Sequence, residues 1–177
     1  MQSLTDEQLM EIYQGNKDGQ GTMALDYLYN RYSIPMFCFF YFSLHNDSDK
    51  AQDFMHDLFV RIIEKKHTFN NNQSFKAWIY RIASNICKND FRSAKVIQKY
   101  ISHILSTSEP IISNNETERI LSECISKLRQ EQRSIIVLRF KLKLTIKEIA
   151  EIYECPEGTI KSRLFYAIKE LSKTYKE

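Results

Sequence analysis

The sequence has little glycine and proline and no long apolar segment. Four Gly and three Pro among 177 residues exclude collagen-like chains and low-complexity chains built on these two residue types. No apolar run approaches the roughly 20 residues that span a bilayer, and the N-terminus has no basic patch followed by an apolar stretch. We therefore expect a globular protein of one or two small domains, without membrane insertion and with a cytoplasmic location.

The patterns that carry catalysis or bind metals are missing as well. The chain has four Cys and four His, which lie far apart, without a Cys-x-x-Cys pair or zinc-ligand spacing. No Ser or Cys stands in a nucleophile elbow, and Gly15, Gly19 and Gly21 lack the Gly-Lys-Ser/Thr ending of a phosphate-binding loop. The sequence predicts no metal site, no disulfide framework, no cofactor and no enzymatic activity.

Charge is distributed unevenly along the chain, although the formal net charge is only +3. Residues 1–65 carry a net charge of −5 and residues 66–103 carry +6, whereas residues 104–140 are neutral and residues 141–177 carry +2. A cationic surface attracts polyanions such as nucleic acids, and an acidic surface attracts basic ones. The acidic first part and the basic middle therefore indicate two different partners.

Apolar residues recur at the three- and four-residue spacing of helices through the first hundred residues. Thr5 and Gln8 predict a capped helix start, Thr22 is a candidate cap for a second helix, and Pro35 either kinks that helix or begins a new one. Two further helices follow the polar stretch 46–49 and the turn-like segment 67–74. Their apolar stripes are Ala51, Phe54, Met55, Leu58, Phe59, Ile62 and Ile63, and Phe75, Trp78, Ile79, Ile82, Ile86 and Phe91.

The outward side of the helix that begins near residue 75 is basic, so we expect it to attract a polyanion. Trp78 shares the spacing of the apolar stripe, which favours a core position over stacking on bases. Tyr80 is expected on the outward face. That face comprises Lys76, Tyr80, Arg81, Ser84, Asn85, Lys88, Arg92, Lys95 and Lys99.

A second helical domain follows a segment in which the periodicity fails. Pro, Ser and Asn cluster in residues 106–115, and the loss of periodicity there indicates a linker. Beyond it, Thr145 and Glu148 form a capping box, and Pro156 suits the first turn of a last helix. Two short helices joined by a tight turn are a helix-turn-helix, whose second helix can enter the major groove of DNA. The predicted fold class is all-α, with two small helical domains at 1–100 and 117–177 joined by a flexible linker at 101–116.

Two parts of the chain together resemble the extracytoplasmic-function class of bacterial RNA polymerase sigma factors, in the sigma-70 family. The matching stretches are AQDFMHDLFVRII at 51–63, FKAWIYRIASNICKNDFR at 75–92 and LTIKEIAEIYECPEGTIKSRLFYAIKEL at 144–171. The resemblance covers roughly residues 4–175, in the family's order. It implies a transcription initiation factor that binds core RNA polymerase and promoter DNA, melts the minus-ten element and grips the minus-thirty-five element. An anti-sigma protein is a further implied partner.

The resemblance implies candidate residues for three surfaces. Those for core polymerase are Asp53, His56, Asp57 and Arg61. Those for the minus-ten element are Phe69, Lys76, Asn85, Lys88 and Arg92, of which Phe69 and Asn85 match positions that line the family's flipped-base pocket. Those for the minus-thirty-five element are Thr159, Lys161, Ser162, Arg163, Phe165 and Tyr166. By residue type, the basic minus-ten candidates favour phosphate contacts over base contacts.

Some of these residues also have a simpler interpretation. Asp53 and Asp57 could belong to a solvated helix face, and Phe69 could pin its loop to the core. Glu154 stands where the family usually has Gly, so a positive φ at that turn would cost roughly 1 kcal/mol. Gln52 replaces an acidic residue of the family's core-binding helix. The alternative function is a stand-alone helix-turn-helix regulator with a helical sensor domain. A third alternative is a purely protein-binding helical adaptor or an RNA-modifying enzyme, which the missing catalytic residues disfavour.

Overall fold

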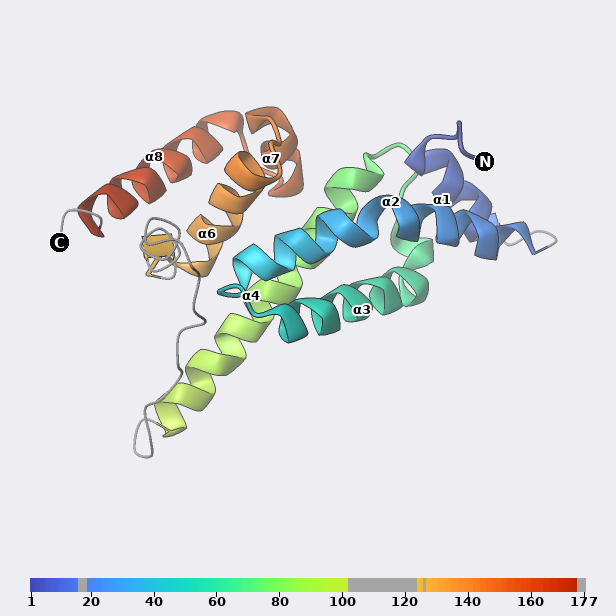
Figure 1. The fold of residues 1–177 in the computed structure, drawn as a ribbon. Coiled ribbons are helices and arrows are strands. Elements are labelled where there is room, and N and C mark those ends of the chain that lie inside the picture. Colours follow the sequence, from blue (N-terminus) through green and yellow to red (C-terminus); the bar gives the residue numbers. More distant parts are fainter. Residues whose placement is uncertain (16–18, 102–123, 126, 175–177) are drawn as a thin grey trace.

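The described part of the chain is built of helices, as Figure 1 shows. This computed structural model describes residues 1–15, 19–101, 124–125 and 127–174. The described residues up to 101, which we term the N-terminal unit, contain α1 Asp6–Gly15, α2 Gln20–Ser43, α3 Ser48–Glu64, the 3-10 turn η1 Lys66–Thr68 and α4 Phe75–Ile101. The described residues from 124 on, the C-terminal unit, contain α6 Gln130–Ile136, the π-helical turn η2 Val137–Lys141, α7 Ile146–Ile152 and α8 Glu157–Thr174. The all-α prediction is confirmed, and residues 102–116 of the expected linker lie outside the described residues.

Side-chain caps fix two helix starts in the N-terminal unit. The backbone N–H of Thr5 donates to Gln8 Oε1 at 2.9 Å, and the backbone N–H of Gln8 donates to Thr5 Oγ1 at 3.2 Å. This reciprocal pair confirms the predicted capping box before α1. Asp47 caps α3, because its carboxylate accepts a hydrogen bond from the backbone N–H of Lys50 at 2.9 Å.

The long helix α2 differs from its prediction at its start, and of the two alternatives for Pro35 the structure has the one in which a single helix contains this residue. It begins at Gln20, directly after Gly19 with a φ of 73°, so Thr22 lies inside the first turn and the predicted Thr22 cap is wrong. Glycine adopts this φ without a Cβ clash, which lets the chain enter the helix earlier. The helix continues through Pro35 to Ser43. Neither α2 nor any other described helix is long and apolar enough to cross a bilayer.

Aromatic rings of α2 pack between α3 and α4. Phe39 and Phe40 are fully buried. The Phe40 ring lies 5.7 Å from the Phe54 ring of α3, and the Phe39 ring lies 5.8 Å from the Tyr80 ring of α4. Trp78 is buried, as its spacing predicts, but Tyr80 is buried too. The predicted outward position of Tyr80 is therefore wrong, because α2 covers that side of α4.

The C-terminal unit contains the predicted helix-turn-helix. The backbone N–H of Thr145 donates to Glu148 Oε2 at 2.7 Å, and the backbone N–H of Glu148 donates to Thr145 Oγ1 at 3.2 Å, which confirms the capping box before α7. Helix α8 begins directly after Pro156. The buried apolar residues that hold these helices together include Ile135, Leu138, Leu144, Ile149, Ile160, Leu164 and Ala167.

The two units pack against each other. Helix α4 runs between them: it contacts α1, α2 and α3 of the N-terminal unit and α6 and α7 of the C-terminal unit (Figure 1). Helix α2 also contacts α6 and η2. The surface of α4 is therefore shared between its own unit and the helix-turn-helix.

Candidate polymerase and nucleic-acid interfaces

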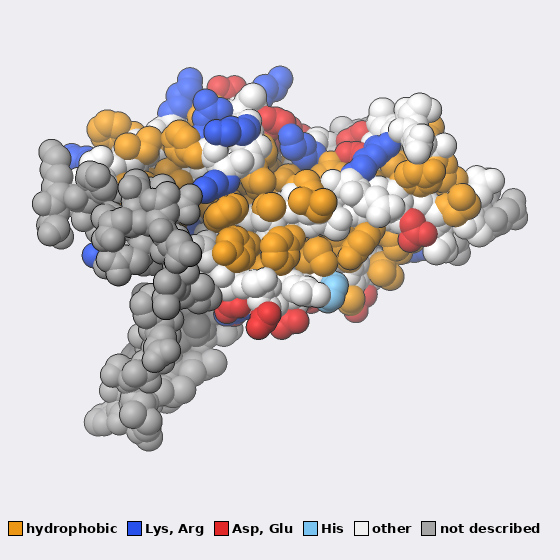
Figure 2. All heavy atoms as spheres, viewed as in Figure 1, with side chains coloured by type: hydrophobic (Ala, Val, Ile, Leu, Met, Phe, Trp, Pro, Cys, Tyr) orange, Lys and Arg blue, Asp and Glu red, His pale blue; other side chains and the backbone are white. Residues whose placement is uncertain are grey.

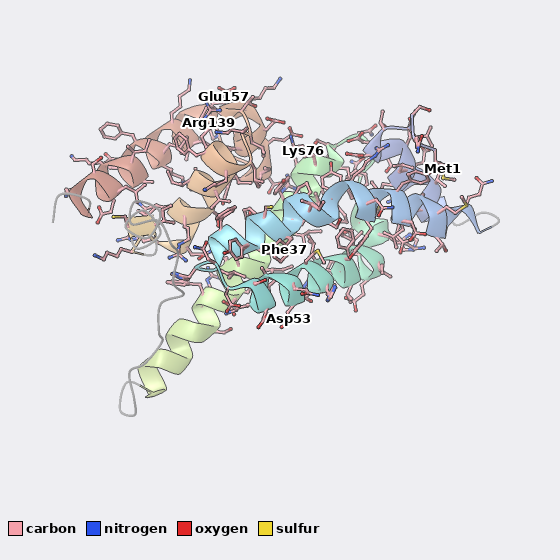
Figure 3. All side chains as sticks on the ribbon, in the orientation of Figure 1. Met1, Phe37, Asp53, Lys76, Arg139 and Glu157 are labelled. Carbon is pink, nitrogen blue, oxygen red and sulfur yellow. The ribbon has the colours of Figure 1, made fainter. Side chains whose placement is uncertain are left out.

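The candidate polymerase residues lie on the outer side of α3. Asp53 and His56 are exposed, and Asp57 and Arg61 are half-buried and paired at 2.9 Å one turn apart. Figure 2 shows acidic side chains and a histidine along the lower edge of the molecule, where α3 runs. In Figure 3, Asp53 points away from the C-terminal unit. The structure thus brings these candidates to one accessible face.

The basic face of α4 is divided between solvent and the C-terminal unit. Asn85, Lys88 and Arg92 are exposed. Lys76, at the start of α4, instead pairs through its Nζ with Glu148 Oε1 of α7 at 2.6 Å (Figure 3 labels Lys76). The hydrogen bond from Lys76 is the largest of the causes that lower the pKa of the Glu148 carboxyl to about 2. Contact of Lys76 with DNA therefore requires this pair to open.

Phe69 lies in the core instead of at a surface. Its side chain is 4% exposed, and its ring lies 5.6 Å from the Phe75 ring and 5.1 Å from the Trp78 ring. The side-chain amide of Gln14 donates to the Phe69 carbonyl at 2.9 Å and thereby ties the loop to α1. Burying a phenyl ring removes a large apolar area from water, which stabilises this position. In this structure the Phe69 ring pins its loop to the core and is not accessible to an unpaired base.

Helix α8 presents most of the minus-thirty-five candidates to solvent. Lys161 and Ser162 are exposed and Thr159 is half-buried. Phe165 and Tyr166 are 62% and 60% exposed, and their ring centroids lie 5.6 Å apart. Two large exposed rings side by side on a helix whose opposite face is packed mark a contact surface.

Arg163, the remaining candidate on α8, is held within the C-terminal unit. Its Nη1 pairs with Glu131 Oε1 of α6 at 2.9 Å, and its guanidinium lies 6.0 Å from the centroid of the Tyr153 ring. The pair is partly exposed, so its net contribution to stability is small. Arg163 can therefore exchange Glu131 for a phosphate at little cost.

The turn between α7 and α8 has a left-handed residue that contacts the other unit. Glu154 has a φ of 50°. A left-handed backbone is less favourable for Glu than for the Gly that the family usually has at this position. The backbone N–H of Cys155 donates to the Ala150 carbonyl at 3.1 Å and closes the end of α7. The Glu154 carboxylate pairs with Arg81 Nη1 of α4 at 2.7 Å.

Arg81 also covers the end of α7. Its Nε donates to the Ile152 carbonyl at 3.3 Å, and its Nη2 donates to the Glu151 carbonyl at 3.1 Å. The carbonyls of a last helical turn carry partial negative charge and favour a nearby cation. Arg81 thus acts as a cap that the N-terminal unit supplies to a helix of the C-terminal unit.

Arg133 of α6, which sequence reasoning missed, makes a second contact between the units. It is 2% exposed. Its Nη1 donates to the Ser43 carbonyl at 3.1 Å and to His45 Nε2 at 2.7 Å, and its other nitrogens donate to the carbonyls of Ile125 and Leu128. Burial lowers the pKa of Arg133 to about 10, so it stays charged at neutral pH. No sequence pattern could reveal this residue, because the fold alone assembles its acceptors.

His45, the partner of Arg133 in the α2–α3 loop, is neutral in this arrangement. Burial lowers its pKa, and the positive charges of Arg133 and Lys50 lower it further. Because an arginine can only donate, His45 Nε2 must accept, which requires an unprotonated nitrogen. The contact therefore depends on the neutral ring.

A hollow of about 240 Å³ lies between α4 and the C-terminal unit. Asn85 and Lys88 of α4 line one side, and Glu131 of α6 and Arg163 of α8 line the other. Candidates for the two promoter elements therefore face the same small space.

Comparison with known protein families reproduces the order of these surfaces along the chain. Residues 28–96 match Sigma-70 region 2, and residues 124–173 match Sigma-70 region 4. The first match holds the polymerase and minus-ten candidates, and the second holds the minus-thirty-five candidates and the helix-turn-helix.

Individual relatives align with nearly the whole chain. It is 29% identical to the ECF RNA polymerase sigma-E factor of Haemophilus influenzae over 94% of this chain and 93% of the relative. It is 27% identical to the RNA polymerase sigma-H factor of Pseudomonas aeruginosa over 95% of this chain and 92% of the relative. The ECF RNA polymerase sigma-E factor of Escherichia coli K12 is 25% identical, over 94% and 92% respectively.

Two solved structures share the fold. The sigma factor RpoE of Bartonella quintana, in complex with the anti-sigma factor NepR, has a TM-score of 0.66 and 23% identity, over 84% of this chain and 96% of that one. CnrH in complex with the cytosolic domain of CnrY has a TM-score of 0.68 and 18% identity, over 95% of both chains. With both sigma regions matched in order and relatives aligned end to end, the chain belongs to the sigma-70 family of RNA polymerase sigma factors, in its extracytoplasmic-function class.

Proposed function

We propose that the chain is a transcription initiation factor that binds core RNA polymerase, directs it to promoters and helps to melt the minus-ten element. The observation that carries the proposal is the combination, on one chain, of a region 2 match with an accessible acidic face and a region 4 match with an exposed recognition helix. A stand-alone regulator needs only the second feature. Because the proposed partner is RNA polymerase, we propose that the protein acts in the cytoplasm and catalyses no reaction of its own.

Helix α3 is the proposed polymerase-binding element. Exposed carboxylates attract a basic surface and orient it on approach. Asp53 is accessible, and Asp57 is held by Arg61 in a surface pair of the kind that contributes only about 0.3–0.5 kcal/mol. Asp57 can therefore exchange Arg61 for a cation of the polymerase. His56 completes the proposed face.

Helix α4 is the proposed minus-ten element reader. The side-chain amide of Asn85 can donate to and accept from the edge of a base, which is accessible to it once the strands separate. Lys88 and Arg92 are suited to phosphates by their charge and exposure. Lys76 joins them when its pair with Glu148 opens.

Helix α8 is the proposed minus-thirty-five reader. Ser162, Phe165 and Tyr166 are exposed and suited to base edges and thymine methyl groups. Thr159 and Lys161 lie near the N-terminus of the helix, where partial positive charge favours phosphate. Arg163 is proposed to contact the backbone after it leaves Glu131.

A gel-shift assay with a fork-junction promoter, with and without core polymerase, tests the proposed function. We expect weak binding by the chain alone and a retarded ternary complex with polymerase. The control is a fork junction of the same length with both promoter elements scrambled. Tight, specific binding of intact duplex by a dimer of the chain alone would instead support the stand-alone regulator. Failure to co-purify with core polymerase would contradict the proposal directly.

An anti-sigma protein is a further proposed partner. The RpoE structure that shares this fold is a complex with the anti-sigma factor NepR, and the resemblance to the class implies a regulator of the same kind here. The expected result is a protein that co-purifies with the chain and is displaced by core polymerase. A captured protein that binds the chain and polymerase together would not be an anti-sigma factor.

A further inference from the structure

We propose that Gln14 of α1 is a positioning residue for reading the minus-ten element, because it holds the loop between α3 and α4 in a shape that presents exposed amides to an unpaired base. The inference rests on the proposed function, since it concerns how that element is read. It adds a residue from a helix that carries none of the promoter candidates and lies outside the Sigma-70 region 2 match at 28–96.

The loop 65–74 joins the proposed polymerase-binding helix α3 to the proposed minus-ten reader α4, and α1 contacts it at η1 (Figure 1). Its tip carries four consecutive amide side chains, all of them exposed: Asn70, Asn71, Asn72 and Gln73. A primary amide both donates and accepts hydrogen bonds, which suits the edge of a base, and it lacks the charge that favours phosphate. The tip is therefore suited to contact a base.

The side chain of Gln14 makes three hydrogen bonds to this loop. Its Nε2 donates to the Lys66 carbonyl at 2.6 Å and to the Phe69 carbonyl at 2.9 Å. Its Oε1 accepts from Nδ2 of Asn71 at 3.0 Å. The bonds to the carbonyls fix the path of the backbone, and the bond to Asn71 fixes the direction of one exposed amide at the tip.

Asn71 keeps the groups that a base edge requires. A primary amide has two N–H groups and a carbonyl oxygen, and the bond to Gln14 needs only one N–H. The second N–H and the oxygen can contact a base together, as amides do with adenine. Because Gln14 fixes the orientation of this amide, it also fixes where the second donor and the acceptor point. Discrimination between bases depends on that direction.

Two further contacts from α1 hold the ends of the loop. The Glu7 carboxylate accepts a hydrogen bond from the backbone N–H of Phe75, the first residue of α4, at 2.9 Å. The partial positive charge of a helix N-terminus stabilises a carboxylate there. At the other end, the Lys66 ammonium lies 4.9 Å from the centroid of the Tyr13 ring. Helix α1 thus holds the loop near its start, at its tip and at the beginning of α4.

Helix α1 is itself anchored to α2. Asp6 pairs with Arg31 of α2 at 2.6 Å and accepts a hydrogen bond from the Tyr32 hydroxyl at 2.5 Å. Binding residues need supporting groups that hold them within about 0.5 Å of the productive geometry. The anchored helix supplies such support to the loop.

The burial of Phe69 is consistent with this role of the loop tip. Its ring is 4% exposed and packs against the rings of Phe75 and Trp78. The ring therefore fixes the loop on the core side, while Gln14 fixes it on the side of α1. The base contact is left to the exposed amides that follow Phe69 in the chain.

The test is Gln14→Met in the full-length chain, assembled with core polymerase. Methionine is similar to glutamine in length but has no amide, so the three hydrogen bonds are lost with little change in packing. Tyr32→Phe is the first control, because it removes a hydrogen bond that anchors α1 without touching the loop. Gln2→Met is the second control, because it makes the same replacement at an exposed position before α1. Circular dichroism and denaturant titration compare the folding of all variants.

The measurement is base preference at each position of the minus-ten element. Fork-junction promoters with each of the four bases at each position compete for the holoenzyme. We expect Gln14→Met to reduce the preference at one position, or at two adjacent ones, by roughly five- to tenfold, with native affinity for core polymerase and native minus-thirty-five preference. Gln14→Glu, which keeps the acceptor oxygen and replaces only the donor group, should reduce it at the same position. Tyr32→Phe and Gln2→Met should keep the native preference throughout.

Asn71→Ala determines whether Gln14 acts through the loop tip. It should reduce the preference at the same position, and adding Gln14→Met should reduce it little further, because residues that act together are not additive. Native preference at every position in both Gln14 variants would overturn the proposal. An even loss over all minus-ten sequences, which a purely structural residue would give, would also overturn it, as would additive losses in the double variant.

Polymerase binding separates this inference from the proposed function. If the wild-type chain fails to bind core polymerase, or its holoenzyme has no preference among minus-ten sequences, the proposed function fails and this inference fails with it. If the wild-type holoenzyme is selective and the Gln14 variants are equally selective, only the positioning role of Gln14 is refuted.

Discussion

The Phe69 ring holds the loop that leads into α4. Substitution of this residue distinguishes a role in core packing from a role in stacking on a base. Phe69→Ala removes a ring that is 4% exposed and should lower the free energy of unfolding by about 3–5 kcal/mol, measured by denaturant titration. Phe69→Leu keeps most of the apolar volume and should retain promoter opening at a temperature where it is folded. Loss of opening in a stable Phe69→Leu chain would show that the ring stacks on a base.

Asn85 provides the corresponding test on the surface of α4. Because its amide is exposed and carries no charge, Asn85→Ala should leave stability and closed-complex binding nearly unchanged. Loss of a base-edge contact should lower binding of pre-melted promoter by polymerase holoenzyme by about 1–3 kcal/mol. Permanganate footprinting of melted thymines, beside filter binding of duplex, measures the two steps. Equal losses of affinity for duplex and pre-melted templates would show that Asn85 acts before the strands separate.

Among the helices, α3 is the element whose function a charge reversal isolates. Asp53→Lys with Asp57→Lys should weaken association with core polymerase roughly tenfold or more, because both side chains lie on its outer face. Glu11→Lys with Asp26→Lys makes the same change in net charge at exposed positions of α1 and α2. If polymerase binding and helicity were both unchanged, Asp53 and Asp57 would belong to an ordinary solvated face of α3 and would not bind the polymerase.

For α8, the prediction concerns which sequences are preferred. Ser162→Ala and Phe165→Ala should change the preferred minus-thirty-five sequence, because these side chains are exposed on the packed helix. Arg163→Ala should weaken all sequences evenly and lower the slope of log affinity against log salt by about one. A promoter library assayed at two salt concentrations measures both effects. If Ser162→Ala and Phe165→Ala instead lowered activity equally on all minus-thirty-five sequences, these side chains would not read bases.

The helices show which parts of the fold the sequence could predict. Capping boxes such as Thr5 with Gln8 and Thr145 with Glu148 are local, so their spacing alone identified two helix starts. Tyr80 was misplaced because α4 is covered from two directions, and a single apolar stripe describes burial from only one. Arg133 could not be found, since an arginine in a polar stretch is normally exposed and its acceptors come from two units.

For the molecule as a whole, the neutral state of His45 makes the contact between the two units sensitive to pH. The pKa of His45 is lowered in the packed arrangement, by burial and by Arg133 and Lys50, and would return toward about 6.5 if the ring met water. A chain with separated units would therefore bind more protons below that pH, so the packed arrangement is favoured above about pH 6.5 and weakens as the pH falls. Lowering the pH from 7.5 to 5.5 should raise the radius of gyration.

A matched variant assigns this pH dependence to one ring. His45→Asn keeps a residue type that tolerates the left-handed backbone, with its φ of 62°, but cannot be protonated. The variant should lose the change in radius between pH 7.5 and 5.5. Glu148 should not contribute, because its pKa of about 2 lies well below this range. If His45→Asn kept the native pH dependence of the radius of gyration, a group other than His45 would be responsible for it.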